Sequence, residues 1–394
     1  MKLDTNSTLF YLLDRLPKDL PVIVVAAGPS LNKNVDKLTE VQDRALIACT
    51  DRAVGALVKH GIRPHLIVTV DISKDTDYIR FDSMSDVPVM ASFQIDPNTL
   101  EYADGRIIFF HAIYLEGELP GLKGKIIGQG DLGGNVATAT YVTFAQAGFK
   151  NVILIGQDLA MLGNKHHADD NAEGEFESGE FIEVEGIDGG TVRSHLDWVS
   201  FRDQYEQFIK GMPDTHCIDA TEGGALIHGS EVMTLQAAIE RYCTVEYDIQ
   251  RMLSDLPRAQ TPEQHAETMA MLSGWADDLD RFIETGAEIK ELLEQLLKVA
   301  RYNDITDRKH AKKLNRLDEL RKSLLDHELY AVLKDHWIRL RSTVPDRSYM
   351  LRNNEEAIPV LEHAIAFYEE LPDNCKSLQE AICQVLDTDK EKKV

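Results

Sequence analysis

The sequence predicts an α/β protein: a Rossmann-like, mostly parallel sheet flanked by helices, followed by an all-α C-terminal helical domain. Short runs rich in Val and Ile alternate with helical segments, and Gly or Asp follows most of these runs. Beyond about residue 231, glycine becomes rare and Leu, Glu, Lys and Arg recur at helical spacing. We therefore predict a short helical lead-in (1–20), a Rossmann-like domain (21–243) and a helical domain (244–394).

Composition narrows the class of protein. The chain has 394 residues, 43% of them hydrophobic, and a formal net charge of -24. This charge opposes binding to nucleic acid or anionic membranes, because both need clustered Lys and Arg. The five cysteines lack Cys-x-x-Cys spacing and predict neither a disulfide framework nor a zinc site. Because the start lacks the pattern of a signal peptide and no apolar run could span a bilayer, we expect a cytoplasmic protein without membrane insertion.

The first predicted strand of the Rossmann-like domain spans residues 21–27 and follows an amphipathic lead-in at 4–17. Its unbroken apolar run suits a strand that is buried on both faces. Gly28 lets the backbone turn tightly, Pro29 restricts φ, and Ser30 brings a hydroxyl and nearby N–H groups. This position in an open α/β sheet is where phosphates and nucleotides bind. The alternative is an ordinary tight turn, because neither a dinucleotide fingerprint nor a P-loop follows.

Two further strands deliver acidic residues. The run at 45–49 leads to Asp51, and the run at 65–70 leads to Asp71. Alternation of strands and helices makes the strands parallel, so their carboxyl ends share one edge of the sheet. We expect a polar edge there, although each Asp by itself is also a common helix cap.

A glycine-rich stretch at 128–135 precedes a predicted helix at 136–146. Backbone N–H groups and the helix dipole converge at such a place, so the stretch is a second candidate anion site. A flexible loop with an Asn cap is the alternative. Further strands are predicted at 87–92, 106–110 and 151–155.

The strand at 151–155 leads to Gln157 and Asp158 at the same edge. His166 and His167 follow in a polar segment, but their spacing fits no standard zinc pattern, so we expect a loop. Runs at 180–185 and 191–193 predict a β-hairpin, after which His195 opens an amphipathic helix.

A last strand at 217–220 precedes the glycine-rich loop 221–225. In the remainder of the chain, prolines are expected to divide the helical pattern into several long helices. These prolines are Pro257, Pro262, Pro345, Pro359 and Pro372.

Four short motifs carry a resemblance to a known family. They are Gly28-Pro29-Ser30-Leu31, Gly133-Gly134-Asn135-Val136-Ala137, Gly156-Gln157-Asp158-Leu159-Ala160 and Thr221-Glu222-Gly223-Gly224-Ala225. In order and spacing they resemble the motility accessory factors, the bacterial flagellin glycosyltransferases, over about residues 20–240. The resemblance implies transfer of a nonulosonic acid, of the pseudaminic, legionaminic or sialic acid type, from a CMP-activated donor to Ser or Thr of flagellin.

The same region is similar to bacterial sialyltransferases that use CMP-sialic acid. This similarity implies that the donor contacts Gly28, Pro29, Ser30, Asp51, Asp71, Gly133, Gly134, Asn135 and Gln157. A carboxylate beside a phosphate is repulsive unless a cation intervenes, so Asp71 is the candidate ligand of a Mg²⁺ ion. The similarity also implies that His195 is the first candidate for the catalytic base. His167, followed by Ala168 as in the motility accessory factors, is the second, and Asp158 is a further catalytic candidate.

Two other functions stay open. The Gly-Pro-Ser and Gly-Gln-Asp regions also look similar to archaeal hydroxymethylpterin pyrophosphokinases, and Mg-ATP would suit the carboxylates of Asp51, Asp71 and Asp158. A non-catalytic protein whose helical region, 244–394, binds flagellin through an apolar groove is the third reading.

Overall fold

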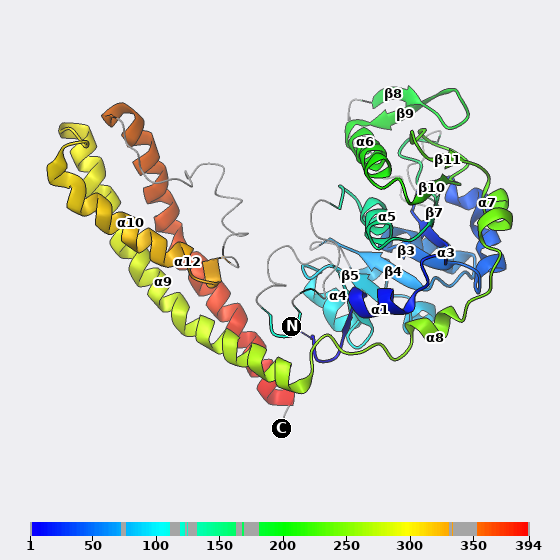
Figure 1. Ribbon diagram of the computed structural model, residues 1–394, viewed down its shortest axis with the longest axis horizontal. Coiled ribbons are helices and arrows are strands. Elements are labelled where there is room, and N and C mark those ends of the chain that lie inside the picture. Colours follow the sequence, from blue (N-terminus) through cyan, green and yellow to red (C-terminus); the bar gives the residue numbers. More distant parts are fainter. Residues whose placement is uncertain are drawn as a thin grey trace. The chain divides into compact units, whose positions relative to one another are not determined.

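The computed structural model in Figure 1 describes residues 2–71, 76–110, 119–122, 124, 132–162, 168, 181–330, 333 and 353–392. The chain forms two compact units. The α/β unit comprises Lys2–Glu116 and Gly121–Ala259, and the helical unit comprises Met1, Gly117–Pro120 and Gln260–Val394. The division falls after Ala259 rather than after residue 243 as predicted, because Ile249 and Leu253 are buried in the core of the α/β unit.

A nine-stranded sheet forms the centre of the α/β unit, and every neighbouring pair of its strands is parallel. The α/β fold class predicted from the sequence is therefore confirmed. In spatial order the strands are β1 (Ser7–Thr8), β6 (Ile107–Phe109), β5 (Val89–Ala91), β4 (Leu66–Thr69), β3 (Leu46–Thr50), β2 (Val22–Val25), β7 (Asn151–Ile155), β10 (His216–Asp219) and β11 (Glu231–Val232).

Helices flank this sheet (Figure 1). Successive side chains of a strand point to opposite faces, and all four residues of β2 are fully buried, so both faces are covered at the centre. The helices of the unit are α1 (Leu9–Arg15), α2 (Leu31–Asn34), α3 (Val54–Lys59), α4 (Pro97–Tyr102), α5 (Val136–Gln146), α6 (Leu196–Gly211), α7 (Leu235–Tyr242) and α8 (Ile249–Leu253).

The order of the strands reverses at β2. Val25 of β2 pairs with Cys49 of β3 on one side and with Ile155 of β7 on the other. The chain runs from β2 to β3 in one direction and reaches β7 only after β6. Such a reversal opens a crevice at the carboxyl ends of the strands, where ligands bind in open α/β sheets.

The start of the chain differs from the predicted helical lead-in. Residues 7 and 8 form β1, which pairs with β6 and extends the sheet. The leucines of α1 are buried in the core, as its amphipathic pattern predicts, whereas Phe10 is 38% exposed. After α2, a 3₁₀ helix spans Val35–Val41.

The predicted hairpin is confirmed as β8 (Phe181–Glu185) paired antiparallel with β9 (Thr191–His195). It is held to two loops of the α/β unit. Ser194 Oγ donates a hydrogen bond to the carbonyl oxygen of Leu159 at 2.8 Å, and Leu226 N–H donates to the carbonyl of Glu185 at 2.9 Å. The hairpin therefore fixes the point at which α6 begins.

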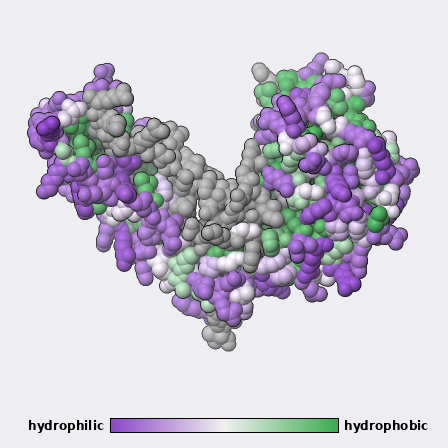
Figure 2. Space-filling view, in the orientation of Figure 1, coloured by the Kyte–Doolittle hydropathy of each residue, from purple (hydrophilic) through white to green (hydrophobic). Residues whose placement is uncertain are grey.

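The helical unit contains α9 (Pro262–Tyr302), α10 (Ala311–Leu325) and α12 (Asn354–Lys392). A capping box formed by Thr261 and Gln264 starts α9, with Pro262 at its first turn as predicted. Hydrophilic residues dominate the visible surface of these helices (Figure 2), which accords with apolar residues buried along α9 and α12. None of the described helices combines the length and apolar character needed to span a membrane.

The prediction that every proline divides this region is wrong for two of them. Pro359 and Pro372 lie inside α12, and Pro345 lies outside the described residues. A proline inside a helix costs about 3 kcal/mol. Packing of α12 on α9, which buries Leu361 and Leu371 among others, offsets this cost.

Two glycines of α9 offer a matched test of this packing. A Cβ atom at Gly286 would overlap Cδ2 of Leu371 on α12, whereas one at Gly274 would meet nothing within 4 Å. Gly274→Ala should therefore raise the free energy of unfolding by about 1 kcal/mol through helix propensity. Gly286→Ala should lower it by about 1–3 kcal/mol through overpacking. Urea unfolding followed by circular dichroism measures both, and equal effects would contradict the packing of α9 on α12.

Candidate functional site

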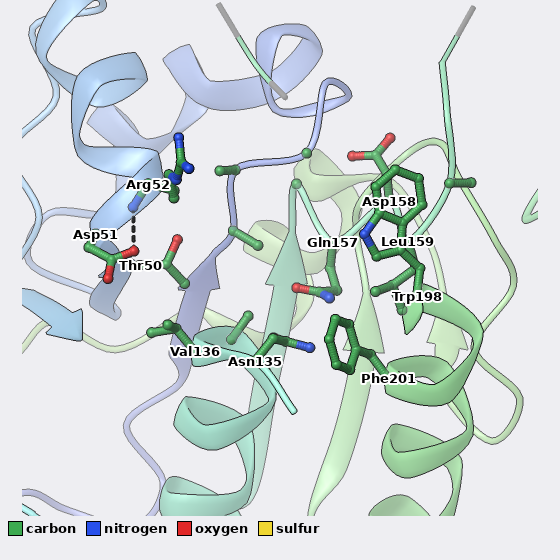
Figure 3. Close-up of a pocket in the computed structure, with 16 residues that line it drawn as sticks. Thr50, Asp51, Arg52, Asn135, Val136, Gln157, Asp158, Leu159, Trp198 and Phe201 are labelled. Carbon is green, nitrogen blue, oxygen red and sulfur yellow. Dashed lines mark hydrogen bonds between the residues drawn. The ribbon is translucent and has the colours of Figure 1, made fainter. Parts of the chain in front are cut away.

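A cavity of about 220 Å³ opens at the carboxyl ends of β2, β3 and β7, at the reversal of strand order (Figure 3). The segments after these strands supply one part of its lining. The first residues of α5 and two aromatic residues of α6, Trp198 and Phe201, supply the rest. The lining residues are 26–28, 50–52, 135–137, 156–160, 198 and 201.

Two glycines bring the ends of β2 and β7 into backbone contact. Gly28 N–H donates a hydrogen bond to the carbonyl of Gly156 at 2.7 Å. A Cβ atom at Gly28 would overlap this carbonyl and the Asp158 carboxylate, and one at Gly156, whose φ is +63°, would overlap the carbonyl of Ala26. Only glycine fits at either position, so the tight turn predicted at Gly28 has a counterpart at Gly156 that the sequence analysis did not identify as a turn.

Ser30 was predicted to contact the sugar donor, and Asp158 was a catalytic candidate. The two residues are hydrogen-bonded to each other. Ser30 Oγ donates to Asp158 Oδ2 at 2.7 Å, and Ser30 N–H donates to the same oxygen at 3.2 Å. Asp158 is 2% exposed. Burial raises the pKa of its carboxyl to about 6, and the hydrogen bonds from Ser30 act in the opposite direction. The carboxylate thus holds the turn after β2.

The glycine-rich loop 221–225 packs behind this carboxylate and is not part of the cavity lining. Ala225 N–H donates to the backbone carbonyl of Asp158 at 2.7 Å, and a Cβ atom at Gly224 would overlap the same backbone. Nearby Asp219 is 1% exposed. Burial is the main reason that the pKa of Asp219 is raised to about 6, with the Asp158 charge as a smaller cause.

Asp51 lines the cavity, and its two carboxylate oxygens accept hydrogen bonds. Arg52 N–H donates to Oδ1 at 2.6 Å, and Thr69 Oγ1 donates to Oδ2 at 2.8 Å. Asp71, at the end of β4, is exposed and is not among the lining residues. Within the described ranges, no group of three or more His, Cys, Asp and Glu residues is arranged to hold a metal ion. The Mg²⁺ assignment of Asp71 stays a prediction.

The start of α5 faces the cavity. Asn135 Oδ1 accepts a hydrogen bond from Thr138 N–H at 3.0 Å, so Asn135 is the predicted cap. Val136 and Ala137, whose N–H groups have no partner within the helix, line the cavity. The positive end of the helix dipole is therefore directed at this space.

Gln157 is the second polar feature of the cavity. It is only 6% exposed, and its amide, which points into the cavity in Figure 3, makes no hydrogen bond with any described residue. The Thr50 hydroxyl likewise has no such partner and belongs to the lining. Both polar groups are therefore placed to bond a polar ligand in the cavity.

Gly133 and Gly134, predicted at the donor, serve helix packing. A Cβ atom at Gly133, whose φ is +85°, would overlap Thr138, and one at Gly134 would overlap the ring of Phe201. Gly134 N–H donates to Gln204 Oε1 at 2.8 Å. Gly134 therefore lets α6 approach the start of α5, whereas Gly133 leaves room for Thr138 in the first turn of α5. Phe201 and Trp198 were not among the site residues predicted from the sequence; their signal is the three-residue spacing on the helix after His195.

His195 caps α6 and lies beside the cavity rather than in its lining. Its Nδ1 accepts a hydrogen bond from Asp197 N–H at 3.4 Å. Its ring centroid is 6.3 Å from that of Phe181 and 6.2 Å from that of Trp198, and Trp198 does line the cavity. His166 and His167 lie outside the described residues. The neighbouring Ala168 donates its N–H to the carbonyl of Ala27 at 2.8 Å.

The pKa of Asp158 predicts how stability depends on pH. Because this pKa rises from 3.8 to about 6 on folding, the folded chain binds a proton here more tightly than the unfolded chain does. The contribution to stability is full below pH 3.8 and is lost as the pH rises through about 6. The free energy of unfolding should therefore fall between about pH 4 and 7. In Asp158→Asn this fall should be smaller by about 3 kcal/mol, as measured by urea unfolding at each pH. An unaltered decline would contradict the burial of this carboxylate.

Comparisons with known proteins bear on the part of the chain that holds the cavity. Residues 2–164 match the family model described as 6-hydroxymethylpterin diphosphokinase MptE-like. They include β1 to β7 and all lining residues except Trp198 and Phe201. A comparison with curated proteins finds no match.

Among solved structures, the chain is similar to the MAf glycosyltransferase from Magnetospirillum magneticum AMB-1, with 18% identity and a TM-score of 0.48. The match covers 94% of this chain and 55% of that chain. The family match over residues 2–164 agrees with the resemblance to hydroxymethylpterin pyrophosphokinases that the sequence motifs indicated. Over residues 2–164, less than half of its length, the chain is similar to the MptE-like family.

Proposed function

We propose that the α/β unit is a glycosyltransferase that binds a nucleotide-activated sugar and transfers the sugar to a hydroxyl group. The cavity at the ends of β2, β3 and β7 is the observation that carries this proposal. It combines two aromatic side chains, Trp198 and Phe201, with the first N–H groups of α5 and with the Gln157 amide, which no described residue hydrogen-bonds. A nucleotide needs both kinds of surface, an apolar face for its base and directed donors for its phosphate.

The proposed donor is a CMP-activated nonulosonic acid, and the proposed acceptor is Ser or Thr of flagellin in the cytoplasm. The resemblance of the four motifs to motility accessory factors supports this choice. These motifs meet at one edge of the sheet, since Asp158 contacts Ser30 and Ala225 while Asn135 and Gln157 line the adjoining cavity. A common location is what a shared binding site requires.

The proposed reaction needs a base for the acceptor and donors for the leaving phosphate. The acceptor oxygen attacks the anomeric carbon, the bond between that carbon and the phosphate oxygen breaks, and CMP leaves. The acceptor proton passes to His195, the first candidate, or to His167. Asp158 positions the turn after β2 in this scheme, because its carboxylate is bonded to Ser30.

Pyrophosphoryl transfer from Mg-ATP is the second candidate function, favoured by the match of residues 2–164 to the MptE-like family. Such a reaction needs carboxylates that hold Mg²⁺ beside the phosphates. Asp51 and Asp158 accept hydrogen bonds from Thr69 and Ser30, which directs these carboxylates toward protein donors. This geometry supports sugar transfer as the first choice.

A ligand panel distinguishes the two candidates. The panel measures the melting temperature with CMP, CMP-sialic acid, ATP and GTP, each with and without Mg²⁺. A ligand that binds only the folded state stabilises it, by about 2.7 kcal/mol at a hundred times its Kd. We expect CMP and CMP-sialic acid to raise the melting temperature more than ATP or GTP. A preference for Mg-ATP would instead support pyrophosphoryl transfer. No response to any of these nucleotides would contradict both and favour a non-catalytic partner protein.

The panel has a matched pair of variants. Gln157→Leu should leave the stability of the ligand-free protein within about 1 kcal/mol of the original, because the amide makes no hydrogen bond with a described residue, and should weaken the nucleotide response. Gln207→Leu makes the same change at an exposed position of α6 outside the cavity and should preserve the response.

The catalytic base is tested by replacing the two histidines. His195→Ala should slow transfer from CMP-sialic acid to purified flagellin by about 10²–10⁴-fold without weakening donor binding, since the loss of a general base affects the chemical step. His167→Ala is the parallel variant. If both single variants and the double variant transfer at the original rate, neither histidine is the base.

A further inference from the structure

Residues 28–31, in the turn after β2, offer no donor for an anion. Gly28 N–H donates to Gly156, and Pro29 has no N–H. Both the N–H and the hydroxyl of Ser30 donate to Asp158, and Leu31 N–H donates to the carbonyl of Gly28 at 3.1 Å. A phosphate in this cavity must therefore be bound by groups other than those of residues 28–31.

Such groups lie across the cavity, at the start of α5. The N–H groups of Val136 and Ala137 belong to the first turn of a helix of 11 residues, and both residues line the cavity. The Thr50 hydroxyl, at the end of β3, lines the same space. Gln157 gives an independent sign of a ligand, because its amide is buried, has no partner among the described residues and is aimed into the cavity (Figure 3).

Arg52 is the one Lys, Arg or His among the described residues that line the cavity. Its guanidinium carbon lies 4.0 Å from the centroid of the Tyr78 ring. Its backbone N–H donates to Asp51, whose other oxygen accepts from Thr69. Arg52 is therefore held at both its backbone and its side chain. The contact with Tyr78 consumes none of the five guanidinium N–H donors.

We propose that a phosphate group of the nucleotide binds between the start of α5 and the guanidinium of Arg52, with the Thr50 hydroxyl as a neutral donor. Tyr78 is a positioning residue that keeps Arg52 at the cavity. The ligand class is a nucleoside phosphate, so the inference rests on the proposed function only in taking a nucleotide as ligand. It requires no particular base and no transfer reaction. A guanidinium and the N–H groups of a helix start are matched to phosphate oxygens.

Lys33 is a nearby cation that follows the turn after β2. Its Nζ donates to the carbonyl of Glu222 at 2.7 Å, and it does not line the cavity. Removing its charge changes the local field without touching the proposed phosphate position. Lys33→Gln is therefore a control for general electrostatic effects.

The test separates the phosphate from the rest of the ligand. Calorimetric titration of the full chain compares cytidine with CMP and adenosine with AMP. Arg52→Gln should lower the affinity for the nucleoside monophosphate by about tenfold to a hundredfold and leave the affinity for the nucleoside unchanged. Tyr78→Leu should give a smaller loss of the same kind, whereas Tyr78→Phe, which keeps the ring, and Lys33→Gln should give none.

The outcomes distinguish this inference from the proposed function. If AMP and not CMP binds, and Arg52→Gln weakens it selectively, the phosphate position stands while CMP-dependent transfer fails. If CMP binds and Arg52→Gln leaves the ratio of CMP to cytidine affinity unchanged, the phosphate position is overturned while the proposed function stands. Equal weakening of cytidine and CMP would also overturn it. Thr50→Val is a second variant, which should also lower the ratio of CMP to cytidine affinity. Circular dichroism checks that each variant is folded.

Discussion

The buried contact between Asp158 and Ser30 is the interaction on which the functional edge of the sheet depends. It joins the turns that follow β2 and β7, and the backbone of Asp158 also accepts a hydrogen bond from Ala225. Gly28 and Gly224 leave no room for a Cβ atom beside Asp158. Burial raises the pKa of this carboxyl, and the Ser30 donors offset part of the cost of keeping it charged.

This contact also decides which groups are available to a ligand. The donors of the turn after β2 are directed at Asp158 and at the backbone of β7, so they stabilise the junction of the strands. Among the described residues that line the cavity, the start of α5, the Thr50 hydroxyl, the Gln157 amide and the Arg52 guanidinium keep donors that no described residue accepts. Structural and ligand-binding roles are thus divided between polar groups that lie close together at one edge.

Local patterns predicted many elements of the sheet. The bounds of α5 and β7 agree with the predicted residues because an Asn cap, helix-forming residues and a β-branched run act over a few neighbouring positions. The strands β1 and β11 have two residues each and escaped prediction, since they exist only through pairing with β6 and β10. Pro372 inside α12 shows the converse, where packing on α9 outweighs a local helix-breaking preference.

The sequence by itself determined where the central strands end and which polar residues follow them, because β-branched runs, glycine and proline act locally. Only the tertiary structure decided what these polar residues contact. Ser30 and Asp158 are 128 positions apart and meet because β2 and β7 are adjacent in the sheet, whereas Asp71 remains exposed outside the cavity lining. Neighbours across strands depend on the order of the whole sheet, which no local pattern encodes.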